Sequence, residues 1–225
     1  MRAISFLVRD DAWRTPAQQI SDLVVEETEG RFALRFGSLV DVGGARLKSR
    51  ISYEASAEGR LVARVSVEPL TDFMTNRTGF VVLHPLEGVA GARVEVEHAS
   101  GGHEAVTLGA TINPAQPLKD IREVTHEPAP GLRATVRMEG DVFEMEDHRN
   151  WTDASFKTYS RPLALPFPFK LEQGKKVEQT ITLTLADAAE GQAAAGSGAH
   201  ARDAVSVGEK LGATMPRIAL AVDAG

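Results

Sequence analysis

Short runs of alternating or β-branched apolar residues recur through the first 185 residues, and glycine-containing pairs such as Glu29-Gly30, Gly43-Gly44 and Gly101-Gly102 separate many of them. This pattern is typical of a large antiparallel β-sandwich. No long amphipathic helix precedes residue 186. We therefore predict an all-β, supersandwich-like antiparallel fold. The predicted strands are 4–9, 20–26, 32–36, 47–53, 61–67, 80–84, 94–98, 104–108, 132–138, 154–159 and 177–185.

For three of these strands the sequence also predicts burial and pairing. In segments 46–53 and 60–67 most apolar residues alternate with polar ones, so each buries one face, and we expect the two to pair as a hairpin around Glu58-Gly59. Segment 80–83 is continuously apolar, as in a central strand that is covered on both sides. Pro85 should end that strand, since proline donates no backbone hydrogen bond.

The composition changes after residue 185. Residues 186–212 are rich in Ala, Gly and Ser, which predicts a flexible linker. Residues 216–223 then read as an apolar strand that needs partners. We expect a β-sandwich domain at 1–185, a linker at 186–212, and at 213–225 the start of a further domain, so that the sequence is a fragment of a longer protein.

Charge and cysteine content narrow the class of protein. The net charge of −6 disfavours nucleic-acid binding, which depends on neutralising phosphates. The absence of cysteine removes thiol nucleophiles and Cys-based metal sites and fits a reducing cytoplasm. The apolar stretch near the N-terminus is too short for a signal peptide or a membrane span. We expect a cytoplasmic protein with no membrane partner, no cofactor and no metal.

The chemically densest segment is 140–159, GDVFEMEDHRNWTDASFKTY, which lies between two strand-like segments. One interpretation is a solvated acidic edge that prevents pairing with other chains. The other is a polar site, because Asn150, Trp151 and Asp153 offer an amide, an aromatic face and a carboxylate beside Arg149 and Lys157. Sugars and sugar acids are bound by that combination.

Three blocks of the sequence resemble the D-apionate lactonase family: Asn76-Arg-Thr-Gly-Phe-Val-Val-Leu-His-Pro, Asp120-Ile-Arg, and Glu144 through Tyr159 followed by Arg161-Pro-Leu-Ala-Leu-Pro. The resemblance implies hydrolysis of a branched-sugar aldonolactone, such as D-apionolactone, in carbohydrate catabolism. It also implies an N-terminal β-rich domain followed by a TIM-barrel-like domain, whose first strand would be residues 216–223. It leaves open whether the chain alone is an active carboxylic-ester hydrolase.

Opening a lactone requires a base that activates water, a group that stabilises the oxyanion, and an acid for the leaving oxygen. No G-x-S-x-G elbow is present, which disfavours a serine nucleophile. On a strand, Glu144, Glu146 and His148 point one way, and Met145, Asp147 and Arg149 the other. The candidate residues divide into two groups. The catalytic candidates are Glu144, Glu146 and Asp147, with Asp153 as a further possible base, and the substrate-binding candidates are Arg149, Asn150, Trp151, Asp153, Lys157 and His84.

Three functions remain open. The first is the N-terminal domain of a lactonase-like hydrolase that contributes a substrate-facing loop and a docking surface to its barrel. The second is a non-catalytic carbohydrate-binding or scaffolding module. The third is a stand-alone sandwich related to sugar mutarotases, which would need a His and a Glu facing one pocket.

Overall fold

The computed structural model describes residues 1–187, and the predicted strand at 216–223 lies outside that range. The described residues form fourteen β-strands and one 3₁₀ helix. The predicted all-β class is confirmed, while the predicted barrel strand stays a prediction. The elements are β1 (Ala3–Asp10), β2 (Gln19–Thr28), β3 (Arg31–Val42), β4 (Ala45–Ser56), β5 (Arg60–Pro69), β6 (Phe73–Pro85), β7 (Arg93–His98), β8 (His103–Thr107), β9 (Leu118–Ala129), β10 (Leu132–Glu139), β11 (Phe143–Asp147), η1 (His148–Trp151), β12 (Ser155–Ser160), β13 (Phe169–Leu171) and β14 (Val177–Asp187).

All described strands belong to one hydrogen-bonded sheet, and every pairing in it is antiparallel. The strand order is β1-β6-β12-β11-β9-β10-β14-β5-β4-β3-β2. β13 pairs with β6, and β7 lies between β8 and β9. The sheet therefore begins and ends with the first two strands of the chain.

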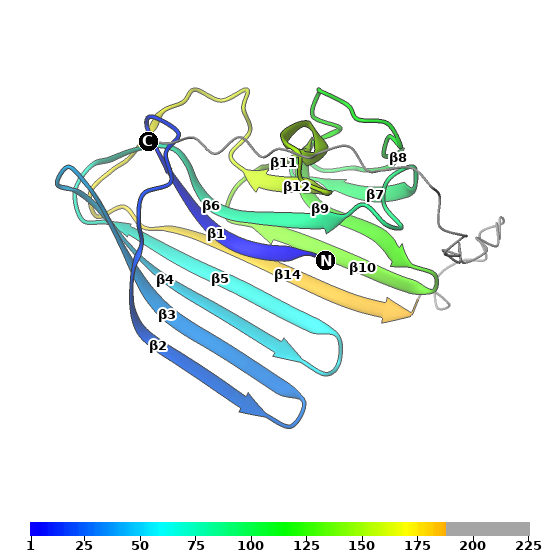
Figure 1. Ribbon diagram of the computed structural model, residues 1–225, viewed down its shortest axis with the longest axis horizontal. Helices are drawn as coiled ribbons and strands as arrows, with labels where there is room; N and C mark the ends of the chain where they lie inside the picture. Colours follow the sequence, from blue (N-terminus) through cyan, green and yellow to red (C-terminus); the bar gives the residue numbers. More distant parts are fainter. Residues whose placement is uncertain (188–225) are drawn as a thin grey trace, which may run out of the picture. The chain divides into compact units, whose positions relative to one another are not determined.

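The sheet folds over so that β6 packs across β4, β5 and β14, and β1 and β6 lie in front of β14 in Figure 1. Phe80 of β6 is fully buried and packs edge-on against Phe6 of β1 and Tyr53 of β4. Gln179 of β14 also joins the layers: its Oε1 accepts from the Phe80 N–H at 2.8 Å, and its Nε2 donates to Ser160 Oγ at 3.0 Å. Apolar burial at this contact is the main source of stability.

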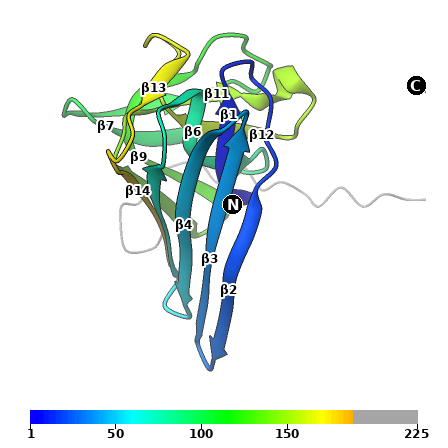
Figure 2. The same cartoon turned by 90° about the vertical axis from the view of Figure 1, so that its left-hand side faces the viewer.

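The strands β2, β3 and β4 extend beyond the layer of β1, β6 and β12, and Figure 2 shows them running downward below it. We call β2 to β5 the wing. Every residue of β2 is exposed. Because the opposite layer does not cover it, the outer part of the wing contributes little to the hydrophobic core.

Several expectations about individual strands are confirmed. β4 and β5 pair around Glu58-Gly59. Phe80, Val81 and Val82 are all buried, so both faces of β6 are covered there, and the strand ends at Pro85. β9 was not predicted, because its buried residues Leu118, Ile121 and Val124 are spaced by three. Asp120 has a φ of 55°, and the pairing with β11 shifts register between Phe143 and Met145, so an irregular backbone replaces strict alternation.

The described residues contain very little helix. Within residues 1–187 the single helical element has four residues, and no helix there is long and apolar enough to span a membrane.

Candidate active site

The segment 140–159 folds as two paired strands, β11 and β12, joined through η1. Glu144 lies opposite Tyr159, and Glu146 lies opposite Lys157. Phe143 and Met145 are fully buried in the core. The predicted alternation is therefore present, and Glu144 and Glu146 share the face that points away from the other layer.

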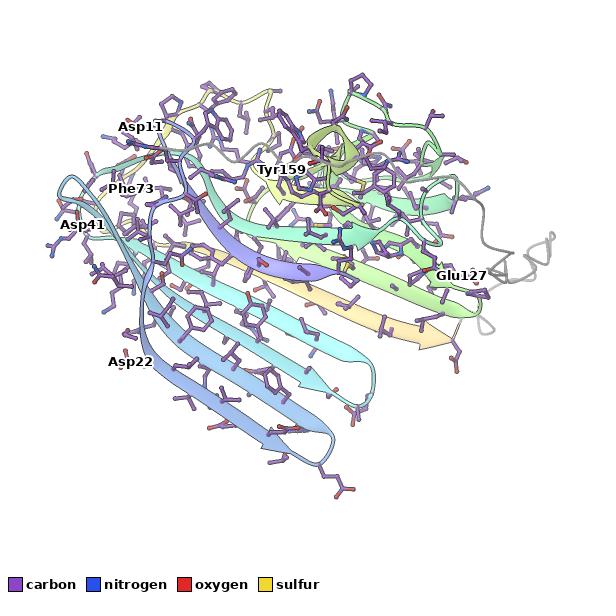
Figure 3. All side chains as sticks on the ribbon, in the orientation of Figure 1. Asp11, Asp22, Asp41, Phe73, Glu127 and Tyr159 are labelled. Atoms are coloured by element: carbon purple, nitrogen blue, oxygen red, sulfur yellow. The ribbon has the colours of Figure 1, made fainter. Side chains whose placement is uncertain are left out.

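We call this surface the polar face and define it by Arg77 of β6, Glu144 and Glu146 of β11, and Lys157 and Tyr159 of β12. Figure 3 labels Tyr159 in the upper layer, well away from Asp22 on the wing. The pairing of β12 with both β6 and β11 brings these three strands together. Residues that are distant in sequence thus meet on neighbouring strands.

Glu144 is held in one position. Its Oε1 accepts hydrogen bonds from Tyr159 Oη at 2.6 Å and from the Leu163 backbone N–H at 2.7 Å. Glu144 is 2% exposed, and its hydrogen bond to Leu163 joins it to the loop 161–168. Burial, followed by the hydrogen bond to Glu144, raises the pKa of Tyr159, which therefore keeps its proton.

Arg77 is a buried cation. Its Cζ lies 3.6 Å from the centre of the Tyr159 ring. Its side chain is among the buried groups, and its Nε has no hydrogen-bond partner within the described part of the chain. Burial lowers the pKa of the guanidinium, although Tyr159, Glu146 and Glu144 oppose that effect. A buried cation without a bonded anion costs free energy, and such groups cluster at functional sites.

A chain of polar contacts leads from Glu146 to the edge of the polar face. Lys157 pairs with Glu146, and its Nζ lies 3.4 Å from His148 Nε2. His148 Nδ1 lies 3.0 Å from Asp153 Oδ2, and Arg2 Nη1 donates to Asp153 Oδ1 at 2.7 Å. The hydrogen bonds from Arg2, Ser155 and His148 lower the pKa of Asp153. Asp153 therefore stays charged and orients His148.

Asp147 and Arg149 lie apart from the polar face. Arg149 Nε and Nη2 donate to the two Asp147 oxygens at 2.8 and 2.7 Å, and its Nη1 donates to the Ala110 carbonyl at 2.7 Å. The Asn113 N–H also bonds to Asp147. Burial alone would raise the pKa of Asp147, but these hydrogen bonds hold it below its usual value. The pair fastens the loop 109–113 onto β11.

Asn150 and Trp151 lie on η1. Asn150 Nδ2 donates to the Asn113 carbonyl at 2.7 Å and to the Asp147 carbonyl at 2.9 Å. Trp151 is 69% exposed. Of the residues predicted from sequence, the structure therefore brings together Glu144, Glu146 and Lys157, places Asp153 at their edge, and leaves Asn150 and Trp151 on the loop side.

His84 is also separate from the polar face, because it points into the core. It is fully buried, with Nε2 2.9 Å from Thr158 Oγ1 and Nδ1 3.1 Å from His126 Nε2. Burial lowers the pKa of both imidazoles, that of His126 to about 4. Within residues 1–187 no group of three or more His, Asp or Glu side chains is placed to hold a metal ion.

Arg77 and Tyr159 were not among the predicted site residues. Both lie within the sequence blocks that resemble the family, and that position was the one indication in the sequence that they belong to the site. Nothing in their spacing connects Arg77 to Glu144, since only the neighbouring positions of β6, β12 and β11 bring them together.

Solved structures define the class of fold. A putative aldose 1-epimerase from Escherichia coli K12 superimposes with a TM-score of 0.51 at 13% identity, covering 79% of this chain and 70% of that one. A galactose 1-epimerase from Lactobacillus acidophilus gives a TM-score of 0.47 at 12% identity, covering 74% and 66%. The chain is thus an all-β domain with the architecture of the Escherichia coli structure.

Sequence relatives define the family. The model of the D-apionate lactonase N-terminal domain matches residues 1–188. A D-apionate lactonase from Brucella anthropi is 44% identical over 201 residues, which are 89% of this chain and 33% of that protein. The chain therefore belongs to the D-apionate lactonase family, as its sequence blocks predicted, and spans about a third of the length of this relative.

Proposed function

We propose that this chain is the N-terminal domain of a hydrolase that opens a sugar-acid lactone of the D-apionolactone kind, and that its polar face forms part of the substrate site. The family membership supports the reaction class. The observation that carries the site is Arg77, a buried guanidinium beside two carboxylates with no ion pair in the described residues.

The reaction adds water across the ester bond of the lactone. Glu146 takes a proton from water as the water oxygen bonds to the carbonyl carbon. Lys157 or Arg77 stabilises the negative charge that develops on the carbonyl oxygen. The bond to the ring oxygen then breaks, and this oxygen takes up the proton that Glu146 received, which leaves a hydroxyl. The new carboxylic acid gives its proton to solvent and becomes a free carboxylate. Arg77 is suited to bind that carboxylate, because a guanidinium can donate two hydrogen bonds to it.

The other predicted residues act around these groups. Glu144 holds Tyr159 against Arg77, and His148 with Asp153 keeps Lys157 in place. Asp147, Arg149 and Asn150 shape the loop beside the site rather than react.

Acid release from D-apionolactone tests this proposal. We would compare the chain alone with the chain joined to the remaining part of the Brucella anthropi relative. Glu146→Gln should lower the rate of the active form by about 100-fold or more, as expected for loss of a general base. The control, Glu87→Gln, removes an exposed carboxylate of the β6–β7 loop. Equal rates for Glu146→Gln and the unchanged chain would reject the catalytic role.

One observation favours a second candidate function, a supporting module. The outer wing exposes a strip of apolar side chains on β2 and β3, and monomeric proteins seldom leave such patches uncovered. The strip consists of Ile20, Val25 and Phe32, which the strand register places on one face of the wing and which are 40 to 57% exposed. The occupant we propose is the polypeptide that follows the matched third in the relative, which is most of that protein's length.

The supporting role has its own test. Val25→Asp should prevent this chain from binding the separately produced remainder of the relative in analytical ultracentrifugation, while Glu27→Gln on the same strand should not. If Val25→Asp binds normally, the strip is not the docking surface. Self-association of the unchanged chain would instead identify a second copy as the occupant.

A further inference from the structure

A groove of about 840 Å³ lies on the wing and includes the start of β14. Its lining contains four basic side chains, Arg35, Lys48, Arg50 and Arg64, and two acidic ones, Asp22 and Glu178. The whole chain has a net charge of −6, so this excess of positive charge is local. We call it the basic groove. It shares no residue with the polar face.

The strand register sets three guanidinium groups around one hydroxyl. Arg35 of β3, Ser52 of β4 and Arg64 of β5 are directly opposite one another. Neighbouring strands are about 4.8 Å apart, so Ser52 lies between the two arginines. Arg50 stands two residues before Ser52 on the same face of β4. All three side chains can therefore reach a single ligand above Ser52.

The neighbours of Arg50 leave it room. It lies opposite Gly37 on β3 and Ser66 on β5, two of the smallest residues. A side chain at Gly37 would meet the Ser21 hydroxyl, so the glycine also keeps the backbone of β2 close. On this side of the wing, small residues therefore flank Arg50, and the charged side chains of Arg35, Arg64 and Lys48 surround it.

The ion pairs in and around the groove are weak or incomplete. Arg35 pairs with Glu26 at 2.6 Å and Arg64 with Glu54 at 3.7 Å, and all four side chains are about half exposed. Exposed pairs of this kind contribute about 0 to 1 kcal/mol. Arg50 and Lys48 have no ion pair among residues 1–187, although Glu178 lies one strand beyond Ser66 and Glu68 lies opposite Lys48. An incoming anion therefore meets little competition.

We propose that the basic groove binds a small organic molecule with two or more carboxylate or phosphate groups. One acidic group is held by Arg35, Arg50 and Arg64 over the Ser52 hydroxyl, and another reaches Lys48. Guanidinium groups suit this role because they donate paired hydrogen bonds to carboxylate and phosphate oxygens. Leu39 and Leu70, which also line the groove, contact the carbon skeleton of the ligand.

Isothermal titration calorimetry of the 225-residue chain tests the proposal. Citrate and fructose 1,6-bisphosphate serve as probes for the two kinds of acidic group, and glucose serves as the neutral control. We expect one saturable site for at least one of the anions and none for glucose. Binding should weaken as salt is raised from about 0.05 M to about 0.5 M, because exposed charges are screened.

Paired variants locate the site. The double substitution Arg50→Gln with Arg64→Gln should weaken binding by about 10- to 100-fold, since hydrogen bonds to charged groups are lost. Arg93→Gln, which removes an exposed arginine on β7, should leave affinity unchanged. All three positions are exposed, so circular dichroism should show intact folding in every variant.

Three outcomes would overturn the proposal. One is affinity for the double variant equal to that of the unchanged chain. Another is no saturable binding of either anion up to about 10 mM, a concentration at which any site of useful affinity would be filled. The third is binding of polyglutamate without binding of either small anion, which would identify the groove as a surface for acidic polypeptides.

Discussion

The polar face and the basic groove carry similar side chains in different physical settings. On the polar face, Arg77, Glu144 and Tyr159 are buried, and two of them hold each other through a hydrogen bond of 2.6 Å. In the basic groove, Arg50 and Lys48 are exposed and unpaired among residues 1–187. The first arrangement fixes geometry before a ligand arrives, as a catalytic site requires. The second leaves charge accessible, as reversible binding of a soluble anion requires.

The largest expected effect is on the free energy of unfolding, and it separates the core below the polar face from the wing that carries the basic groove. Phe80→Ala should lower the free energy of unfolding by about 3–5 kcal/mol, because a fully buried ring that joins the two layers is lost. Ile20→Ala on the exposed strand β2 should change it by about 0.5 kcal/mol or less. Urea denaturation measures both, and similar losses would show that the wing is as firmly packed as the core.

The next effect concerns the ion pair behind the polar face. Arg149→Met should destabilise the fold by about 3 kcal/mol, because it leaves the buried Asp147 carboxylate without its partner. Arg64→Met, in the basic groove, should cost about 1 kcal/mol or less, because its pair with Glu54 is exposed. Equal unfolding free energies for the two variants would contradict the distinction between buried and exposed charge.

The buried histidines beneath the polar face predict a pH effect. The pKa of His126 is about 4 in the folded chain against 6.5 for an ordinary imidazole, so the unfolded chain binds protons first as pH falls. Stability should decline between pH 6.5 and about 4, by roughly 3 kcal/mol at most from this group.

His126→Gln should flatten that part of the stability profile, whereas His103→Gln, at an exposed position of β8, should not. Urea midpoints measured across this pH range check the result. A profile that His126→Gln leaves unchanged would mean that other groups cause the acid loss.

Of the substitutions at buried positions, the smallest effect on stability should come from Arg77. Arg77→Met keeps a long apolar side chain on Tyr159 and removes a buried charge, so unfolding should change by about 1 kcal/mol or less. Lactone hydrolysis by the joined protein should nevertheless fall by about 100-fold, as when a group that stabilises an oxyanion is lost. A large loss of stability with little loss of rate would assign Arg77 a structural role.

The sequence by itself determined the fold class, most of the strands, the hairpin of β4 and β5 and the family. The fold class, the strands and the hairpin depend on local spacing, because alternation sets which side chains are buried and glycine pairs set the turns. The family was predicted from the resemblance of three sequence blocks. It also predicted that Glu144 and Glu146 share one face, because both lie on one regular strand. It missed β9, where an irregular backbone interrupts the alternation.

Only the tertiary structure decided which charged residues belong together. Asp147 and Arg149 belong to the same segment, 140–159, as Glu146, yet they hold the loop 109–113 in place. Arg77, by contrast, joins the polar face from β6. The basic groove likewise combines residues from five strands whose outward faces, one at a time, look like ordinary solvated surface. Pairing between distant strands places these side chains, and local sequence spacing carries no record of which strands become neighbours.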